Sequence, residues 1–136
     1  MKLAYVDTSC LVAIAFGEPG YERVVDRLNR CERLFSSNLL EAEFRAALAR
    51  EGVADKEGDL LSGFTWILPN RPLTAEYERI LTAGTLKGAD LWHVACALFL
   101  SPDPKELAFL TLDGPQGTVA RALGFPSLSF ENLGQG

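Results

Sequence analysis

The sequence has few of the residues that cross-link or metallate small proteins. Its three cysteines, Cys10, Cys31 and Cys96, are an odd number without metal-ligand spacing, so neither a disulfide framework nor a zinc finger is indicated. We expect reduced thiols in an intracellular protein. The single histidine, His93, lies about one helical turn from Cys96, where such a pair is more often packing than a catalytic thiol with its base.

Long apolar runs and a cationic excess are also missing. No N-terminal segment combines a basic start with a long apolar core, and no run of about 18 apolar residues occurs, so we expect a soluble cytoplasmic protein without membrane association. The 18 acidic and 13 basic side chains give a net charge of −5, opposite to that of a simple nucleic-acid binder. A nucleic-acid enzyme is not excluded, because acids that bind divalent cations make the charge negative while the nine arginines could line a local phosphate track.

What the chain does contain is an alternation of strand-like and helical segments. Its 136 residues fit one domain, which we place at residues 1–130, followed by a disordered tail at 131–136. The alternation indicates an α/β fold with a mostly parallel sheet and helices on both faces. Strands are predicted at residues 3–6, 33–36, 64–68, 107–112 and, at the edge, 126–130; helices are predicted at residues 11–16, 20–30, 39–50, 55–61, 75–85, 87–100 and 118–123.

Two of the predicted strands are apolar on both faces and lead to an aspartate. Residues 3–6 precede Asp7, and residues 107–112 precede Asp113. Ligands of open α/β sheets bind outside the carboxyl ends of the strands, so both aspartates are placed for chemistry rather than for packing. They come close together if the two strands are neighbours. Residues 114–117, which are rich in glycine and proline, are predicted to form a turn.

The helix predicted at residues 39–50 contains two glutamates with different expected roles. At about 100° per residue, Glu43 lies on the same side as the apolar Leu40. Glu41 lies on the opposite side beside Arg45, where the two form an exposed pair one turn apart. A lone carboxylate on an apolar face is costly to bury unless it is paired or coordinates a metal, so Glu43 is the candidate functional acid.

The helix predicted at residues 87–100 carries a further acid and the histidine. Asp90 falls in its first turn or at its N-cap, where an aspartate can simply satisfy free backbone N–H groups and the helix dipole. His93 shares the face of Asp90, and it is either a hydrogen-bonded boundary residue or a catalytic base. The position of Asp90 or of His93 alone does not decide between these roles.

The parallel sheet would bring four acids into one pocket: Asp7, Glu43, Asp90 and Asp113. Four neighbouring carboxylates repel one another, so either some are protonated or a cation lies among them. Oxygen-only ligands favour Mg²⁺ or Mn²⁺ over zinc. Such a cation can activate water and stabilise charge on phosphoryl oxygens, which is the apparatus for hydrolysing a phosphodiester.

Four segments of the sequence, LAYVDTS, SSNLLEAEFRAALAR, LKGADLWHVACAL and FLTLD, resemble the motifs of a PIN domain in their order and spacing. The resemblance covers about residues 2–130 and is strongest to the small VapC-type toxins of VapBC toxin–antitoxin modules. It implies a three-layer α/β/α sandwich with a mostly parallel sheet of four to five strands. It also implies a Mg²⁺- or Mn²⁺-dependent ribonuclease whose catalytic and metal-binding residues are Asp7, Glu43, Asp90 and Asp113.

The same resemblance implies supporting residues and partners. Thr8, Ser9 and Thr111 match hydroxyl positions that would hold the geometry of the acids. His93 matches a histidine that is common but not universal among relatives, so its role stays open. Relatives usually form homodimers and are inhibited by a cognate antitoxin whose C-terminal segment reaches into the acidic groove.

Two other interpretations remain. A haloacid-dehalogenase-like phosphatase also places an aspartate at the end of its first strand, but it normally has a second aspartate two residues later, where this chain has Ser9, and a lysine partner is not obvious. The other interpretation is a PIN scaffold without catalytic activity that acts only by binding a protein or RNA partner.

Overall fold

The computed structural model of the chain describes residues 2–53 and 59–127. Its sheet has four strands, all parallel, in the order β3-β2-β1-β4, which confirms the predicted α/β fold and the four- to five-stranded sheet. The strands are β1 (Leu3–Val6), β2 (Arg33–Ser37), β3 (Phe64–Ile67) and β4 (Ala108–Leu110).

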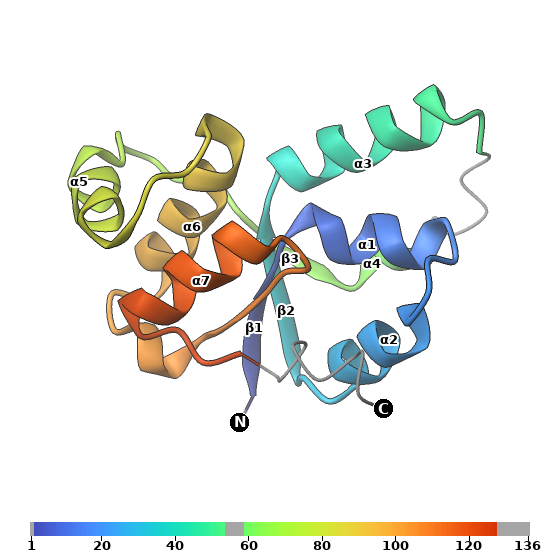
Figure 1. Cartoon of the computed structure of the whole chain (residues 1–136), viewed down its shortest axis with the longest axis horizontal. Helices are drawn as coiled ribbons and strands as arrows, with labels where there is room; N and C mark the ends of the chain where they lie inside the picture. Colours follow the sequence, from blue (N-terminus) through green and yellow to red (C-terminus); the bar gives the residue numbers. More distant parts are fainter. Residues whose placement is uncertain (1, 54–58, 128–136) are drawn as a thin grey trace.

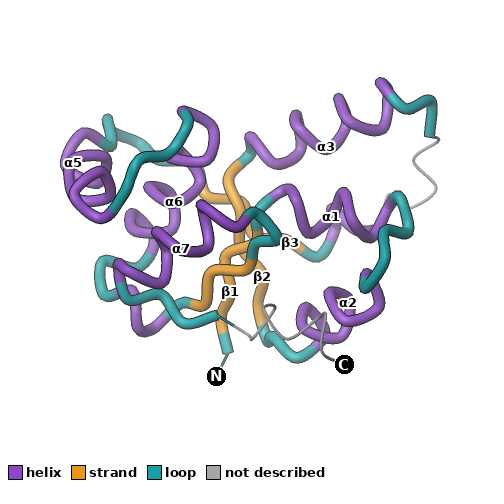
Figure 2. Tube along the Cα trace, viewed as in Figure 1, coloured by secondary structure: helices purple, strands orange, loops and turns teal. Residues whose placement is uncertain are grey.

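Helices cover both faces of this sheet and complete the three layers (Figure 1). Figure 2 shows the strands as a central layer between the two groups of helices. One face carries α1 (Thr8–Ala15), α2 (Tyr21–Asn29), α3 (Leu39–Arg50) and α4 (Asp59–Ser62). The other face carries α5 (Thr74–Ala83), α6 (Gly88–Leu100) and α7 (Gly114–Leu123), with the 3₁₀ helix η1 (Pro104–Glu106) between α6 and β4.

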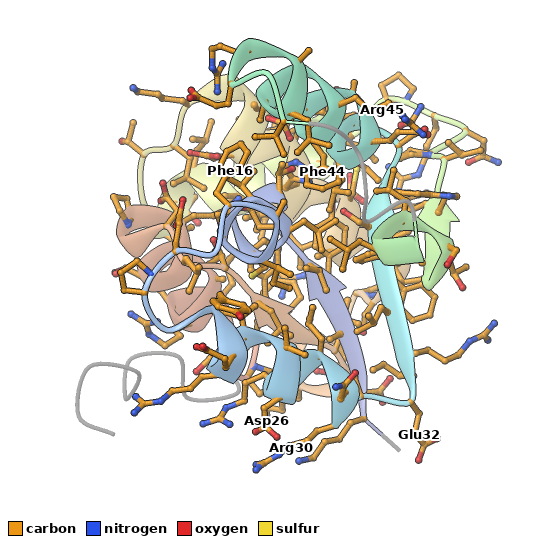
Figure 3. The ribbon with its side chains drawn as sticks, turned by 90° about the vertical axis from the view of Figure 1, so that its right-hand side faces the viewer. Phe16, Asp26, Arg30, Glu32, Phe44 and Arg45 are labelled. Carbon is orange, nitrogen blue, oxygen red and sulfur yellow. The ribbon has the colours of Figure 1, made fainter. Side chains whose placement is uncertain are left out.

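The central strand β1 serves both cores because its residues alternate between the two faces. Ala4 and Val6 belong to the core under α1 to α4, whereas Tyr5 belongs to the core under α5 to α7, and all three are fully buried. Phe44 of α3 and Phe16 at the end of α1 close the first core on the outer side (Figure 3). A strand that is buried on both faces explains why residues 3–6 are apolar without a polar alternation.

The carboxyl ends of β1 and β4 lie side by side because these strands are neighbours in the sheet. The Asp7 amide donates to the Leu110 carbonyl at 2.9 Å, which continues the ladder one residue past β1. The predicted convergence of the two strand ends is therefore confirmed.

The turn predicted at residues 114–117 is wrong, because these residues form the first turn of α7. Asp113 is the N-cap, and its side chain accepts from the Gln116 amide at 2.8 Å. Proline is tolerated in a first helical turn, where its missing N–H has no intrahelical partner in any case. The helix ends at Gly124, whose φ of 108° lies in the left-handed region.

Several predictions fall partly or wholly outside the described residues. The predicted tail at 131–136 and most of the predicted edge strand at 126–130 lie there. Pro126 and Ser127 do not form a strand, although the Phe109 amide donates to the Pro126 carbonyl at 3.0 Å. Within residues 2–53 and 59–127, no helix is long and apolar enough to cross a lipid bilayer.

Candidate active site

The first acid, Asp7, is held at the start of α1 by its neighbours. It is the N-cap of this helix, and its Oδ2 accepts from the Ser9 amide at 3.0 Å. The hydroxyl of Thr111, which follows β4, lies 3.3 Å from the same oxygen. Only 5% of Asp7 is exposed. The capping geometry therefore fixes the direction of a buried carboxylate at the centre of the sheet edge.

Glu43, in α3, lies at the same end of the sheet as Asp7. Its Oε1 accepts from the Thr8 hydroxyl at 2.7 Å and lies 2.7 Å from Nε2 of His93. Burial by itself raises the pKa of Glu43, but the hydrogen bonds from His93 and Thr8 outweigh this effect and lower the pKa below its ordinary value. The predicted contrast with Glu41 is present, since Glu41 forms an exposed ion pair with Arg45 at 2.8 Å.

His93 is buried and links Glu43 to the core tyrosine of β1. Its Nδ1 lies 2.7 Å from the Tyr5 hydroxyl, and its Nε2 also lies 3.9 Å from Oδ1 of Asp7. Burial raises the pKa of Tyr5 well above its ordinary value, so the phenol keeps its proton. Because the Tyr5 oxygen already accepts from the Ser37 amide at 3.2 Å, we assign its proton to Nδ1 and the imidazole proton to Nε2, which donates to Glu43.

A second network joins the ends of β1 and β4 through Thr111. The Thr111 hydroxyl accepts from the Asp113 amide at 3.0 Å, and it donates to Oε1 of Gln116 at 2.7 Å. Ser9 Oγ accepts from the Leu112 amide at 3.0 Å and lies 3.3 Å from Thr111 Oγ1. These contacts place both hydroxyl side chains between the two aspartates.

Gln116 belongs to this network but is missing from the sequence prediction. It is fully buried, and its Nε2 donates to the Asp90 carbonyl at 3.3 Å, so it ties the first turn of α6 to that of α7. The spacing Asp113-x-x-Gln116 is that of a capping box and could have marked the start of α7. Tyr5 gave no such signal, because its partner His93 is 88 residues away.

Asp90 and Asp113 form the more open side of the site. Both are half-buried, and Asp90 lies in the first turn of α6, whose N-cap position is Lys87. Burial raises the pKa of Asp90, and the nearby carboxylates of Asp113, Asp7 and Glu43 raise it further, with a smaller opposing effect of His93. The carboxylates of Asp7, Glu43 and Asp113 are therefore all near enough to Asp90 to oppose its ionisation.

The donor chemistry of these carboxylates fits a hard divalent cation. Carboxylate oxygens are preferred ligands of Mg²⁺, and the repulsion at Asp90 is what a positive ion would relieve. In the part of the chain that the structure describes, however, no three His, Cys, Asp or Glu side chains are already arranged to hold an ion. The acids converge in this structure without closing into a preformed metal site.

The acids lie at the carboxyl edge of a parallel α/β sheet, which is where such folds bind their ligands. A comparison with known protein families matches residues 4–101 to the PIN domain. The chain belongs to the PIN domain family, whose members are typically nucleases and generally use divalent metals. The match contains Asp7, Glu43 and Asp90 and ends before Asp113. Comparisons with curated proteins and with solved structures found no match.

Proposed function

We propose that this protein is an endoribonuclease that hydrolyses RNA phosphodiester bonds with Mg²⁺ or Mn²⁺. The proposed catalytic and metal-binding residues are Asp7, Glu43, Asp90 and Asp113. The observation that carries the proposal is the convergence of these residues at the carboxyl edge of the sheet. Nε2 of His93 lies 2.7 Å from Glu43 and 3.9 Å from Asp7, and the Thr111 hydroxyl lies 3.3 Å from Asp7 and 3.0 Å from the Asp113 amide. Family membership supports the nuclease chemistry, and the RNA substrate follows from the resemblance of the four motifs.

The cation would supply an activated water molecule and would stabilise negative charge on the phosphoryl oxygens. The chain's own residues orient the ligands. The Ser9 amide directs Oδ2 of Asp7, and Thr8 and His93 both bond to Oε1 of Glu43. Preorganised ligands of this kind do not have to be ordered again at each turnover.

Gln116 and Thr111 fix the backbone of Asp90 and Asp113, the two acids on the open side of the site. Gln116 holds the Asp90 carbonyl, and Thr111 holds the Asp113 amide. The carboxylate of Asp90 accepts no hydrogen bond from a described residue, so its oxygens are available to an ion or to water. In this proposal His93 and Tyr5 act through Glu43 and do not touch the substrate.

We further propose that the protein is the toxin of a VapBC-type pair. In this proposal it is a cytoplasmic homodimer inhibited by a cognate antitoxin. What supports this part is the resemblance of the segments LAYVDTS, SSNLLEAEFRAALAR, LKGADLWHVACAL and FLTLD, in that order. A small protein that co-purifies when the neighbouring reading frame is expressed with this one, and whose removal releases RNA cleavage, would support it.

The activity is tested by cleavage of RNA with Mn²⁺ or Mg²⁺ and its loss on chelation. Asp7→Asn and Asp90→Asn should each lower the rate by about 100-fold or more, since a bound metal contributes several kcal/mol of transition-state stabilisation. Glu41→Gln is the matched control, because it neutralises an acid of α3 that faces solvent. Unchanged cleavage by either aspartate variant would contradict the acidic-site mechanism.

The two alternative functions give different results in direct measurements. An aspartyl-phosphate phosphatase would bind beryllium or aluminium fluoride at Asp7, and membership of the PIN family makes this the weaker alternative. A scaffold without catalytic activity would bind no Mn²⁺ at millimolar concentration in a calorimetric titration. We expect Mn²⁺ binding in the parent and its loss in Asp90→Asn.

A further inference from the structure

A cleft opens directly beside Asp90 and Asp113, the two half-buried acids on the open side of the site. It has a volume of about 430 Å³ and lies between the segment that joins α5 to α6 and the first turn of α7. Figure 1 shows both segments on the side of the sheet that carries α5, α6 and α7. The cleft is lined by Thr85, Leu86, Lys87, Asp90, Asp113 and Pro115.

Lys87 is the cation of this lining, and it is exposed. Within residues 2–53 and 59–127 its ammonium group forms no ion pair, even though Asp90 is three positions away. Several arginines, in contrast, are engaged with acids of the surface, at distances of 3.1 Å for Arg30–Asp26, 2.8 Å for Arg45–Glu41 and 2.6 Å for Arg71–Glu76. Figure 3 shows Asp26 and Arg30 on α2 and Arg45 on α3, two helices on the side of the sheet that carries α1 to α4.

The rest of the lining is suited to a nucleoside rather than to a compact anion. Leu86 and Pro115 present apolar surface from opposite walls, and Thr85 adds a hydroxyl group. The volume lies in the range of roughly 300–1,000 Å³ that is usual for ligand pockets. Because Asp90 and Asp113 repel a free anion, a ligand that combines a phosphate with an apolar or aromatic part fits this lining better than phosphate alone.

A second cavity adjoins the other side of Asp113, but it is a poorer match. It has a volume of about 200 Å³ and contains the aromatic residues Phe109 and Phe125. Its cation, Arg121, is within 3.4 Å of the Thr118 hydroxyl on the same helix. The larger cleft therefore combines the unpaired cation, the two acids and sufficient space.

We propose that this cleft binds the nucleotide next to the scissile phosphate of a single-stranded RNA. Lys87 contacts the phosphate of that nucleotide, and Leu86 and Pro115 pack against its base and sugar. The inference rests on the proposed ribonuclease function and adds to it a substrate-positioning residue. A lysine acts as a point charge toward phosphate, so the contact secures affinity without selecting a base sequence.

The test compares Lys87→Gln with Lys87→Arg and with Lys105→Gln as the matched control. Lys105 is also an exposed lysine, but it lies in η1, before the amino end of β4 and away from the acids. Binding of a fluorophore-labelled single-stranded RNA of mixed sequence is followed by fluorescence anisotropy with Ca²⁺ in place of Mn²⁺. Cleavage of the same RNA with Mn²⁺ then gives KM and kcat.

We expect Lys87→Gln to weaken RNA binding and raise KM several-fold with little change in kcat. The slope of log affinity against log salt concentration should become shallower by about 0.7, which is the value for one contact to a single-stranded phosphate. Lys87→Arg should retain the slope, and Lys105→Gln should behave as the parent. The thermal unfolding temperatures of the Lys87 and Lys105 variants should equal that of the parent, because both side chains are exposed.

The inference is overturned if Lys87→Gln retains the affinity and salt slope of the parent, or if Lys105→Gln loses as much as Lys87→Gln. A fall in kcat without a change in KM or binding would also overturn it, because Lys87 would then act in the chemical step. If the parent bound RNA through Lys87 but never cleaved it with any divalent metal, the proposed ribonuclease function would fail while the binding cleft stood.

Discussion

The two sides of the acidic site differ in how their carboxylates are held. On the closed side, Asp7 and Glu43 accept hydrogen bonds from Ser9, Thr8 and His93. On the open side, Asp90 accepts none from a described residue, and it lines a cleft of about 430 Å³ together with Asp113. We infer that the closed side holds Asp7 and Glu43 in a fixed geometry, whereas the open side leaves the Asp90 carboxylate and the cleft accessible to an ion and a substrate.

The electrostatics of the two sides follow from this difference. Hydrogen bonds from His93 and Thr8 overcome the effect of burial and lower the pKa of Glu43. The Asp90 carboxylate has no such hydrogen bonds from a described residue, and burial together with the carboxylates of Asp113 and Asp7 outweighs the opposing effect of His93 and raises its pKa. One carboxylate is therefore stabilised by the protein itself, whereas the other is left in an unfavourable state that a cation can relieve.

The largest effect on folding is expected from a change at Tyr5, which bonds to His93 on the closed side. Tyr5→Phe removes the hydroxyl that donates to Nδ1 of His93 and accepts from the Ser37 amide. We expect the free energy of unfolding, measured by urea denaturation, to fall by about 2 kcal/mol, because buried polar groups are left without partners. Cleavage should also slow, since His93 would no longer be fixed toward Glu43.

Tyr77→Phe is the control for this change. Tyr77 is a half-buried tyrosine of α5, and its hydroxyl bonds to no residue in the described ranges. We expect its free energy of unfolding to change by about 0.5 kcal/mol or less. Equal losses in the two variants would mean that the chain of hydrogen bonds from Tyr5 to Glu43 does not support the closed side.

The next prediction sets the two sides directly against each other in the protein without metal. A carboxyl with a raised pKa costs stability once the pH rises above its ordinary value, so Asp90→Asn should stabilise the protein at neutral pH, by up to about 1 kcal/mol. That gain should fade as the pH is lowered toward 3.8, the ordinary value for Asp90. Thermal unfolding across this pH range measures the change.

Glu43→Gln should have the opposite sign. A lowered pKa contributes stability above the ordinary value of 4.5, and this contribution is lost as the pH falls through the lowered pKa. Because a third of the Glu43 side chain is exposed, at 33%, we expect the loss at neutral pH to be only about 1 kcal/mol. Stabilisation by both variants, or destabilisation by both, would remove the distinction between the sides.

Much of this arrangement could be predicted from the sequence because it depends on local patterns. The runs that precede Asp7 and Asp113 are apolar on both faces, and such runs form central parallel strands whose carboxyl ends meet when the strands are neighbours. The helical periodicity of α3 separated Glu43 from Glu41 in the same way. The local apolar periodicity and the order of the strands were therefore sufficient to predict where these residues lie.

The parts that could not be predicted depend on contacts between distant segments or on competing meanings of one residue. Nothing local indicates that Tyr5 bonds to His93 or that Gln116 reaches the Asp90 carbonyl. Pro115 was interpreted as part of a turn, although proline is equally suited to a first helical turn once Asp113 caps it. The length of α7 was underestimated for this reason.

The smallest effect is expected at Glu41, the acid of α3 that faces solvent and belongs to neither side of the site. Glu41 pairs with Arg45 at 2.8 Å, and 44% and 56% of the two side chains are exposed. Glu41→Gln should therefore lower the free energy of unfolding by only about 0.3 kcal/mol, and the difference should disappear in about 1 M salt, where exposed pairs are screened. Urea denaturation at low and high salt measures it. A loss as large as that of Glu43→Gln would show that helix surface charge, rather than the hydrogen bonds of the closed side, determines how α3 contributes to stability.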